Sequence, residues 1–253
     1  HMINDHLGLE LLIGEVDAYL QNDEPLGLPE AVPYREYIAH SQALVREGTA
    51  QAYFQRCFAD LDSPTLPFGE ANTQVLANQI IETFFTFDPL VSQSIRQHCQ
   101  RLGVTSASFF HLVWALVTGR CSGSDDVVFG TVLSGRLQGT VGAAQTVGLF
   151  INTLPLRVSL IGPVEACLIS THKALLALIS HEHASLGLVR ECTQLSADAP
   201  LFSSLFNYRI DNLSEAPFIA ETDVKLVESE EIADIIPVGD GYERTNYPFN
   251  LSV

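Results

Sequence analysis

Two apolar runs separated by a glycine-rich segment constrain this chain more than any other part of its sequence. Residues 127–133 and 149–158 are rich in Val, Leu, Ile and Phe, and glycine or proline interrupts or borders each run. Apolar runs of this length bounded by turn residues are typical of buried strands. The polar segment between them has neither a helical nor an alternating period. We therefore predict two core strands of a sheet, with Arg136 and Arg157 just past strand ends, where a charge can reach a cleft or solvent.

Helical patterns and one further strand pattern surround this stretch. Apolar residues at helical spacing predict helices over residues 7–20, 49–61, 88–102, 106–118 and 163–180. Asp88-Pro89 is a good helix start, Gly103 a good stop, and Thr105 a cap for the helix that follows. Residues 79–87, which are rich in Ile, Thr and Phe, predict a strand.

Composition excludes several classes of function. The chain has 253 residues, of which 13 are Lys or Arg and 30 are Asp or Glu, and its formal net charge of −17 argues against nucleic-acid binding. Its longest apolar run is far shorter than a membrane span, which predicts a soluble domain without a membrane partner. The five cysteines are scattered without a C-x-x-C pair, which fits reduced thiols in the cytoplasm and predicts no metal site.

Several segments resemble one known family. Residues 130–136, GTVLSGR, match the "G-x-x-x-x-G-R" segment of the condensation domains of non-ribosomal peptide synthetases. Residues 147–157, VGLFINTLPLR, match the family's "(I/V)-G-x-F-V-N-T-x-x-x-R" segment almost residue for residue. Further matches lie at residues 34–40, 181–186, 200–209 and 242–253. We interpret residues 34–40 as part of a helix whose aromatic residues are merely packed.

The first residues resemble the family's H-H-x-x-x-D-G signature, beginning at the second histidine. His1 then corresponds to that histidine and Asp5 to the acid, while His6 replaces the glycine. The alternative interpretation is a frayed terminus in which His1-Met2 is a remnant of cloning.

The resemblance implies a fold. It is the α/β (two-layer α+β) chloramphenicol-acetyltransferase-like fold, with two lobes arranged in a V and the first lobe incomplete. Residues 1–68 would be the remainder of the N-terminal lobe with the active-site signature. Residues 69–253 would be the C-terminal lobe without its final strands and helix.

The resemblance also implies an acyltransferase that forms peptide bonds, although it leaves the activity of this piece itself open. A donor acyl or peptidyl thioester would react with the amine of an acceptor aminoacyl thioester. Both substrates would be carried on the phosphopantetheine of donor and acceptor carrier domains, beside an adenylation domain, and this domain itself would bind no cofactor.

By the same correspondence, His1 would be catalytic, as a general base or as a group that orients the amine. Asp5 would be structural, with Arg136 as its candidate partner. His6, Gly148 and Asn152 would border the cleft, and Asn152 could either donate a hydrogen bond to substrate or tie adjacent strands together.

Other functions remain open at this point. A free-standing acyltransferase acting on a soluble amine or alcohol is one, and a catalytically silent carrier-binding domain is another. The sequence gives no donor or acceptor identity and no stereochemical subtype.

His111 lies in a helix that is apolar nearly all round, so we interpret it as a core histidine.

Overall fold

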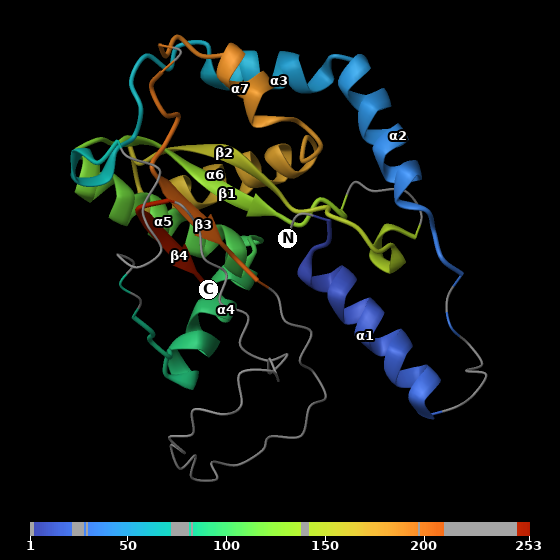
Figure 1. Cartoon of the computed structure of the whole chain (residues 1–253). Coiled ribbons are helices and arrows are strands. Elements are labelled where there is room, and N and C mark those ends of the chain that lie inside the picture. Colours follow the sequence, from blue (N-terminus) through green and yellow to red (C-terminus); the bar gives the residue numbers. More distant parts are fainter. Residues whose placement is uncertain are drawn as a thin grey trace.

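The computed structural model describes residues 3–21, 28, 30–71, 81, 83–137, 142–196, 198–209 and 247–253. Figure 1 shows the helices and strands of this part of the chain. The helices are α1 (His6–Gln21), α2 (Tyr34–Arg46), α3 (Thr49–Phe58), α4 (Pro89–Leu102), α5 (Ser106–Ser122), α6 (Val164–Ile179) and α7 (Leu186–Glu191), with short turns η1 (Pro67–Gly69) and η3 (Ala143–Gln145). The strands are β1 (Asp126–Leu133), β2 (Asn152–Ser159), β3 (Ser204–Asn207) and β4 (Phe249–Ser252).

The described strands form one mixed sheet in the order β2-β1-β3-β4. β1 and β2 are antiparallel, with Asp126 opposite Ser159 and Leu133 opposite Asn152. β3 is parallel to β1, and β4 is parallel to β3. The two apolar runs predicted as core strands are therefore confirmed as β1 and β2. They are neighbours in the sheet, and the glycine-rich segment connects them.

The strand predicted over residues 79–87 is wrong where it can be assessed. Residue 81 and residues 83–87 carry no strand, whereas residues 79, 80 and 82 lie outside the described residues. Phe84 and Phe85 are largely exposed. A preference of aromatic residues for strands reflects packing against a half-buried sheet surface, and these side chains have no such surface.

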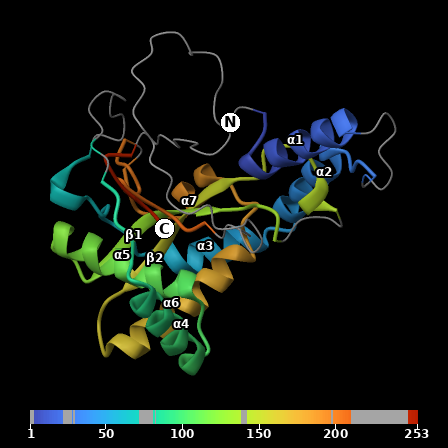
Figure 2. The ribbon, with the colours of Figure 1, turned by 90° about the horizontal axis from the view of Figure 1, so that it is seen from below.

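Helices pack around the sheet and share one core with it. α5 and α6 contact each other and the strands β1 and β2, and α4 lies against α5 (Figures 1 and 2). α3 packs against α7, and its residues Ala50, Tyr53, Phe54 and Phe58 belong to the same hydrophobic cluster as β1 and β2. α1 and α2 extend beyond the end at which β1 finishes (Figure 1). The predicted boundary between residues 68 and 69 stays a prediction.

The ends of α4 and α5 confirm the sequence signals for helix capping. The Asp88 carboxylate accepts a hydrogen bond from the amide of Leu90, and Pro89 occupies the first helical position. Gly103 ends α4 in the left-handed region, with φ 66°. The Thr105 hydroxyl then accepts from the amide of Ser108 at the start of α5.

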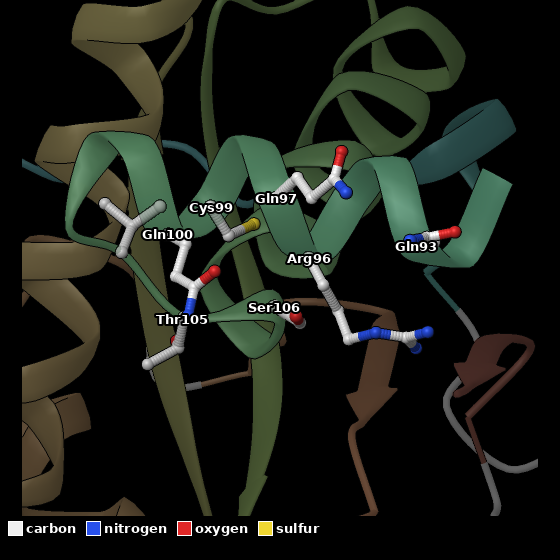
Figure 3. Close-up of a pocket in the computed structure, with 8 residues that line it drawn as sticks. Gln93, Arg96, Gln97, Cys99, Gln100, Thr105 and Ser106 are labelled. Carbon is white, nitrogen blue, oxygen red and sulfur yellow. The ribbon is translucent and has the colours of Figure 1, made fainter. Parts of the chain in front are cut away.

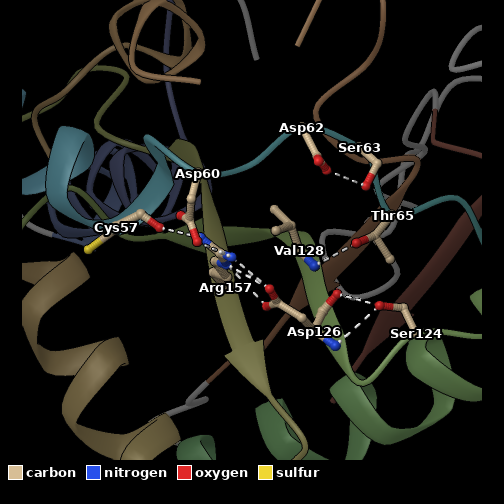
Figure 4. A network of polar contacts seen from close by, with 9 residues as sticks. All are labelled: Cys57, Asp60, Asp62, Ser63, Thr65, Ser124, Asp126, Val128 and Arg157. Atoms are coloured by element: carbon tan, nitrogen blue, oxygen red, sulfur yellow. Dashed lines mark hydrogen bonds and ion pairs between the residues drawn. The ribbon is translucent and has the colours of Figure 1, made fainter. Parts of the chain in front are cut away.

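Arg157 lies inside β2, which corrects its expected place just past a strand end. Its guanidinium lies 2.6 Å from the carboxylate of Asp126 on the neighbouring strand β1. It also lies 2.6 Å from the carboxylate of Asp60 and donates to the carbonyl of Cys57 at 2.8 Å, both at the end of α3 (Figure 4). These contacts raise the pKa of Arg157 and lower the pKa of Asp60. Arg157 thus ties the end of α3 to the sheet and does not reach toward a cleft.

His111 is buried in the middle of α5, in agreement with its interpretation as a core residue. Its ring is 3% exposed, its Nδ1 lies 2.7 Å from the carbonyl of Ala107, and Phe206 packs edge-on to it at 4.4 Å. Burial lowers the pKa of His111 to about 4. The ring therefore stays neutral in the folded protein at a pH at which a solvated histidine is charged.

The buried imidazole is expected to make the protein acid-sensitive. Between the ordinary histidine pKa of about 6.5 and about 4, the unfolded chain binds a proton that the folded chain excludes, so stability falls as pH falls. Between about pH 7 and about pH 5, the His111 contribution amounts to a loss of about 2 kcal/mol. Urea unfolding of the parent and of His111→Leu at the two pH values measures it. On going from about pH 7 to about pH 5, His111→Leu should lose about 2 kcal/mol less of its free energy of unfolding than the parent. His98→Leu, which removes an exposed histidine, should lose as much as the parent. Equal losses in the parent and in His111→Leu would contradict this.

Candidate functional site

Asp5 lies at the first turn of α1 and joins it to the loop before β2. Its carboxylate Oδ1 accepts from the amide of Gly8 at 2.9 Å, which caps the helix. Its own amide donates to the carbonyl of Gly148 at 3.2 Å, and its Oδ2 accepts from the amide of Phe150 at 3.2 Å. A carboxylate so early in the chain is therefore fixed against residues almost 150 positions later.

Arg136 forms a buried ion pair with Asp5. Its Nη2 lies 2.7 Å from Asp5 Oδ1, its Nε lies 3.3 Å from Oδ2, and the two side chains are 8% and 3% exposed. Its Nη1 donates to the carbonyls of Ala143 and Thr146, and the guanidinium lies 3.9 Å from the centre of the Phe150 ring. The structure thus brings together the two residues that the resemblance named as partners, and Arg136 also organises the segment between β1 and β2.

Two glycines allow this packing. Gly135 has φ 68°, and a Cβ there would overlap the carbonyl oxygen of Phe150. At Gly148 a Cβ would overlap the ring of Tyr34. The space that a side chain at position 148 would need is thus occupied by the Tyr34 ring of α2. Gly148 borders the cluster, but its role at a substrate cleft stays a prediction.

Aromatic residues of α2 complete the cluster, and our sequence interpretation did not place them there. The Tyr34 hydroxyl donates to the carbonyl of Leu149, and the rings of Tyr34 and Tyr37 lie 5.2 and 4.3 Å from that of Phe150. Burial is the main cause that raises the pKa of both tyrosines. The resemblance of residues 34–40 to the family was the available signal. We interpreted those aromatics as packed, which the structure confirms, but the sequence did not show that they pack at this cluster.

Asn152 is the first residue of β2, and its amide binds the turn between α6 and α7. Nδ2 lies 2.8 Å from the carbonyl oxygen of Glu182 and 2.7 Å from that of Ala184, and Oδ1 accepts from the amide of Thr153. These contacts are neither a hydrogen bond to substrate nor a tie between adjacent strands, the two roles expected from the sequence. Its amide ties a strand to a turn, and both of its N–H groups bond to the protein itself.

The turn after α6 faces α2 across a narrow recess. The recess is too narrow to hold a separate water molecule. It is lined by Tyr37, His40, Ser41, Leu44, Gly135, Glu182 and His183. Burial is the first cause that lowers the pKa of His181 and of His183, so both rings favour the neutral form near pH 7. Among the described residues there is no group of His, Cys, Asp and Glu that could hold a metal ion.

The remaining predicted site residues lie differently. His6 is partly exposed, and its Nε2 lies 3.0 Å from Glu10 one turn along α1. His1, the predicted catalytic residue, lies outside the described residues. The structure therefore brings Asp5, Arg136 and Gly148 into one cluster and joins Asn152 to the neighbouring turn.

A larger cavity lies elsewhere, at the corner between α4 and α5. It has a volume of about 500 Å³, and Figure 3 shows Gln93, Arg96 and Gln97 extending from α4 beside Thr105 and Ser106 at the start of α5. Its lining contains no carboxylate and no histidine, and no residue of the Asp5–Arg136 cluster contributes to it. We therefore place the candidate site at the buried ion pair and not at this cavity.

A membrane-spanning helix is not found in the described part of the chain. No single helix there is long and apolar enough to cross a membrane. Only α4 and α5 taken together reach the necessary length and apolar character, and this pair is bent by 104°.

Comparison with known proteins connects this chain with one family. The family model of the condensation domain matches residues 1–253. Malpinin synthetase of Mortierella alpina is 38% identical over 254 residues, which cover 100% of this chain and 3% of the synthetase. Tyrocidine synthase 3 of Brevibacillus parabrevis is 29% identical over 259 residues, which cover 100% of this chain and 4% of that protein. The chain thus spans only a small part of these relatives.

Solved structures share the fold. The first condensation domain of the CDA synthetase aligns with a TM-score of 0.66 at 20% identity, and the match covers 83% of this chain and 47% of that one. The condensation domain of the Monacolin K polyketide synthase aligns with a TM-score of 0.62, also at 20% identity, over 81% of this chain and 51% of that one.

Proposed function

Since this chain belongs to the condensation-domain family of non-ribosomal peptide synthetases, we propose that it forms an amide bond between two thioester-bound substrates. The acceptor's amine attacks the carbonyl carbon of the donor thioester, so a C–N bond forms and the C–S bond breaks. The donor's carrier thiol leaves, and the amine loses one proton. The fold is the chloramphenicol-acetyltransferase-like fold expected from the sequence.

One observation carries this proposal: the buried pair of Asp5 and Arg136. It fixes the segment that resembles the histidine signature against residues 130–136, the segment that resembles the family's "G-x-x-x-x-G-R" motif. Asp5 follows His1 by four positions in the same signature segment. Preorganisation of this kind is what a reaction between two tethered substrates needs, because alignment supplies much of its rate.

His1 is proposed to act on the amine. A neutral imidazole can accept the proton of the amine or hold the amine in line with the carbonyl carbon, and both roles suit a pH near 7. Asp5 is proposed to be structural. Its two carboxylate oxygens already accept hydrogen bonds from two backbone amides and from Arg136, which leaves little capacity for proton transfer.

Substrates are proposed to arrive on the phosphopantetheine arms of a donor and an acceptor carrier domain, with an adenylation domain as neighbour and the cytoplasm as location. Phosphopantetheine then belongs to the partners, and this domain contributes no cofactor of its own. The similarity to malpinin synthetase and tyrocidine synthase 3 supports partners of this kind.

The proposal is tested by His1→Ala in the complete synthetase, with donor and acceptor carriers loaded. Loss of the imidazole is expected to slow amide formation by about 10²- to 10⁴-fold, the usual contribution of a general base. Mass spectrometry of the acceptor carrier measures the rate. His98→Ala, which removes an exposed histidine of α4, is the matched control and should leave the rate unchanged.

Other outcomes assign a different function. Unchanged amide formation in His1→Ala would remove His1 from the mechanism. Turnover of soluble amines without carriers would favour a free-standing acyltransferase. Carrier binding without any product in the parent protein would favour a silent carrier-binding domain.

A further inference from the structure

We propose that Asn152 is a positioning residue for the condensation reaction, which fixes the turn between α6 and α7 against α2 and donates no hydrogen bond to substrate. The link to catalysis rests on the proposed function. The role in holding the turn rests on the structure alone.

Both N–H donors of the Asn152 side chain are used within the protein. An asparagine amide has two N–H donors, and here they lie 2.8 and 2.7 Å from the carbonyl oxygens of Glu182 and Ala184. Carbonyl oxygens only accept, so the nitrogen and not the oxygen of the amide must face them. Oδ1 accepts from the amide of Thr153. No N–H group remains for a substrate atom.

The turn that Asn152 holds is buried and rich in polar atoms. Glu182 is 2% exposed and Ala184 is 1% exposed. The amide of Glu182 donates to the carbonyl of Ile179 at 3.1 Å, and that of Ala184 donates to His181 at 3.0 Å. These bonds make a short local turn, and Asn152 supplies a tie from the turn to the sheet.

The held turn meets both α2 and the segment that carries Arg136. Glu182 and His183 line the narrow recess together with Tyr37 and His40 of α2 and with Gly135. Gly135 directly precedes Arg136, and Asn152 is paired with Leu133 at the end of β1. Figure 1 shows the turn between α6 and α7 on the side of the sheet that faces α2. Asn152 therefore couples the place of α2 to that of the ion pair.

A positioning role has a distinct kinetic expectation. Loosening the turn should misalign groups around the reacting atoms, and misplacement of about 1 Å can cost about 10²-fold in rate. Because both N–H groups of Asn152 bond to the turn and none donates to substrate, its variants should lower kcat about 10- to 100-fold with little change in the KM for the loaded carriers. A direct substrate contact that is present throughout the reaction would instead raise KM.

The test uses Asn152→Asp and Asn152→Ala in the complete protein, first without any substrate. Hydrogen exchange followed by mass spectrometry reports the protection of the amides of residues 182–184. Loss of two hydrogen bonds should speed their exchange about tenfold or more. Asp should loosen the turn more than Ala, because its carboxylate oxygen would face two carbonyl oxygens. Asn250→Asp, on the exposed side of β4, is the control and should change neither exchange nor kcat.

The outcomes separate this inference from the proposed function. Unchanged exchange in both Asn152 variants overturns the inference, whether or not the protein makes amide bonds. Faster exchange with unchanged kcat, in a protein that makes amide bonds, overturns the catalytic part. Absence of product from the parent protein contradicts the proposed function and, with it, the catalytic part of the inference, but not the hold on the turn. The alanine variant adds no charge, so it decides the question if the aspartate variant does not fold.

Discussion

Replacing Arg136 with alanine is expected to lower the free energy of unfolding by about 3 to 5 kcal/mol, as measured by urea denaturation. The substitution leaves the Asp5 carboxylate 97% buried without its cation, since its side chain is only 3% exposed. It also removes one donor to each of the carbonyls of Ala143 and Thr146 and the cation from the face of Phe150. A buried charge without a partner is costly, whereas the same pair in water would contribute little.

A matched ion pair on the surface gives the control. Arg101 pairs with Glu165 at 3.1 Å, and both side chains are more than half exposed. Arg101→Ala should therefore cost less than about 1 kcal/mol. The double variant Asp5→Ala, Arg136→Ala should cost much less than the sum of its single variants, because each single change strands the other residue. Additive losses would contradict the idea that the two residues act as one unit.

Gly135→Ala is expected to be the second large effect, with a loss of about 3 to 5 kcal/mol or a failure to fold. Two causes add. Gly135 has φ 68°, a conformation that costs an ordinary residue about 1 to 2 kcal/mol. In addition, the new Cβ would overlap the backbone carbonyl of Phe150, which cannot move without disturbing the contacts of Phe150 with Asp5 and Arg136.

Gly123 separates the two causes. It also has φ 68°, but an added Cβ there would meet nothing within 4 Å. Gly123→Ala should therefore cost only about 1 to 2 kcal/mol, the conformational part alone. Thermal unfolding of the two variants side by side measures the difference. Equal losses in both would mean that the close approach to Phe150 carries no energy.

The parts of the fold that local chemistry determines could be predicted from the sequence. The Asp88-Pro89 start of α4 and the Thr105 cap of α5 depend on residues within one helical turn. The buried strands β1 and β2 follow from apolar runs bounded by turn residues. The strand predicted over residues 79–87 failed where it could be assessed, because aromatic and β-branched composition does not say whether a partner strand is present.

Long-range contacts could not be predicted from spacing. The pair of Asp5 and Arg136 joins residues 131 positions apart, and only the resemblance to a family suggested it. The hydroxyl of Tyr34 reaches Leu149 across 115 positions, and the amide of Asn152 reaches a turn 30 and 32 positions away. A sequence pattern reports periodicity along one element. Which element packs against it is determined by the whole core, so the packing of Tyr34, Tyr37 and Gly135 against Phe150 was recognised only in the structure.

The central claim is that this chain joins two carrier-bound substrates by an amide bond. Intact-protein mass spectrometry of the acceptor carrier tests it most directly, with a loaded donor carrier, a loaded acceptor carrier and the synthetase that contains this chain. The account predicts an acceptor whose mass increases by the donor acyl group, with the donor carrier returned as a free thiol. An acceptor that keeps its original mass while both loaded carriers bind would contradict it.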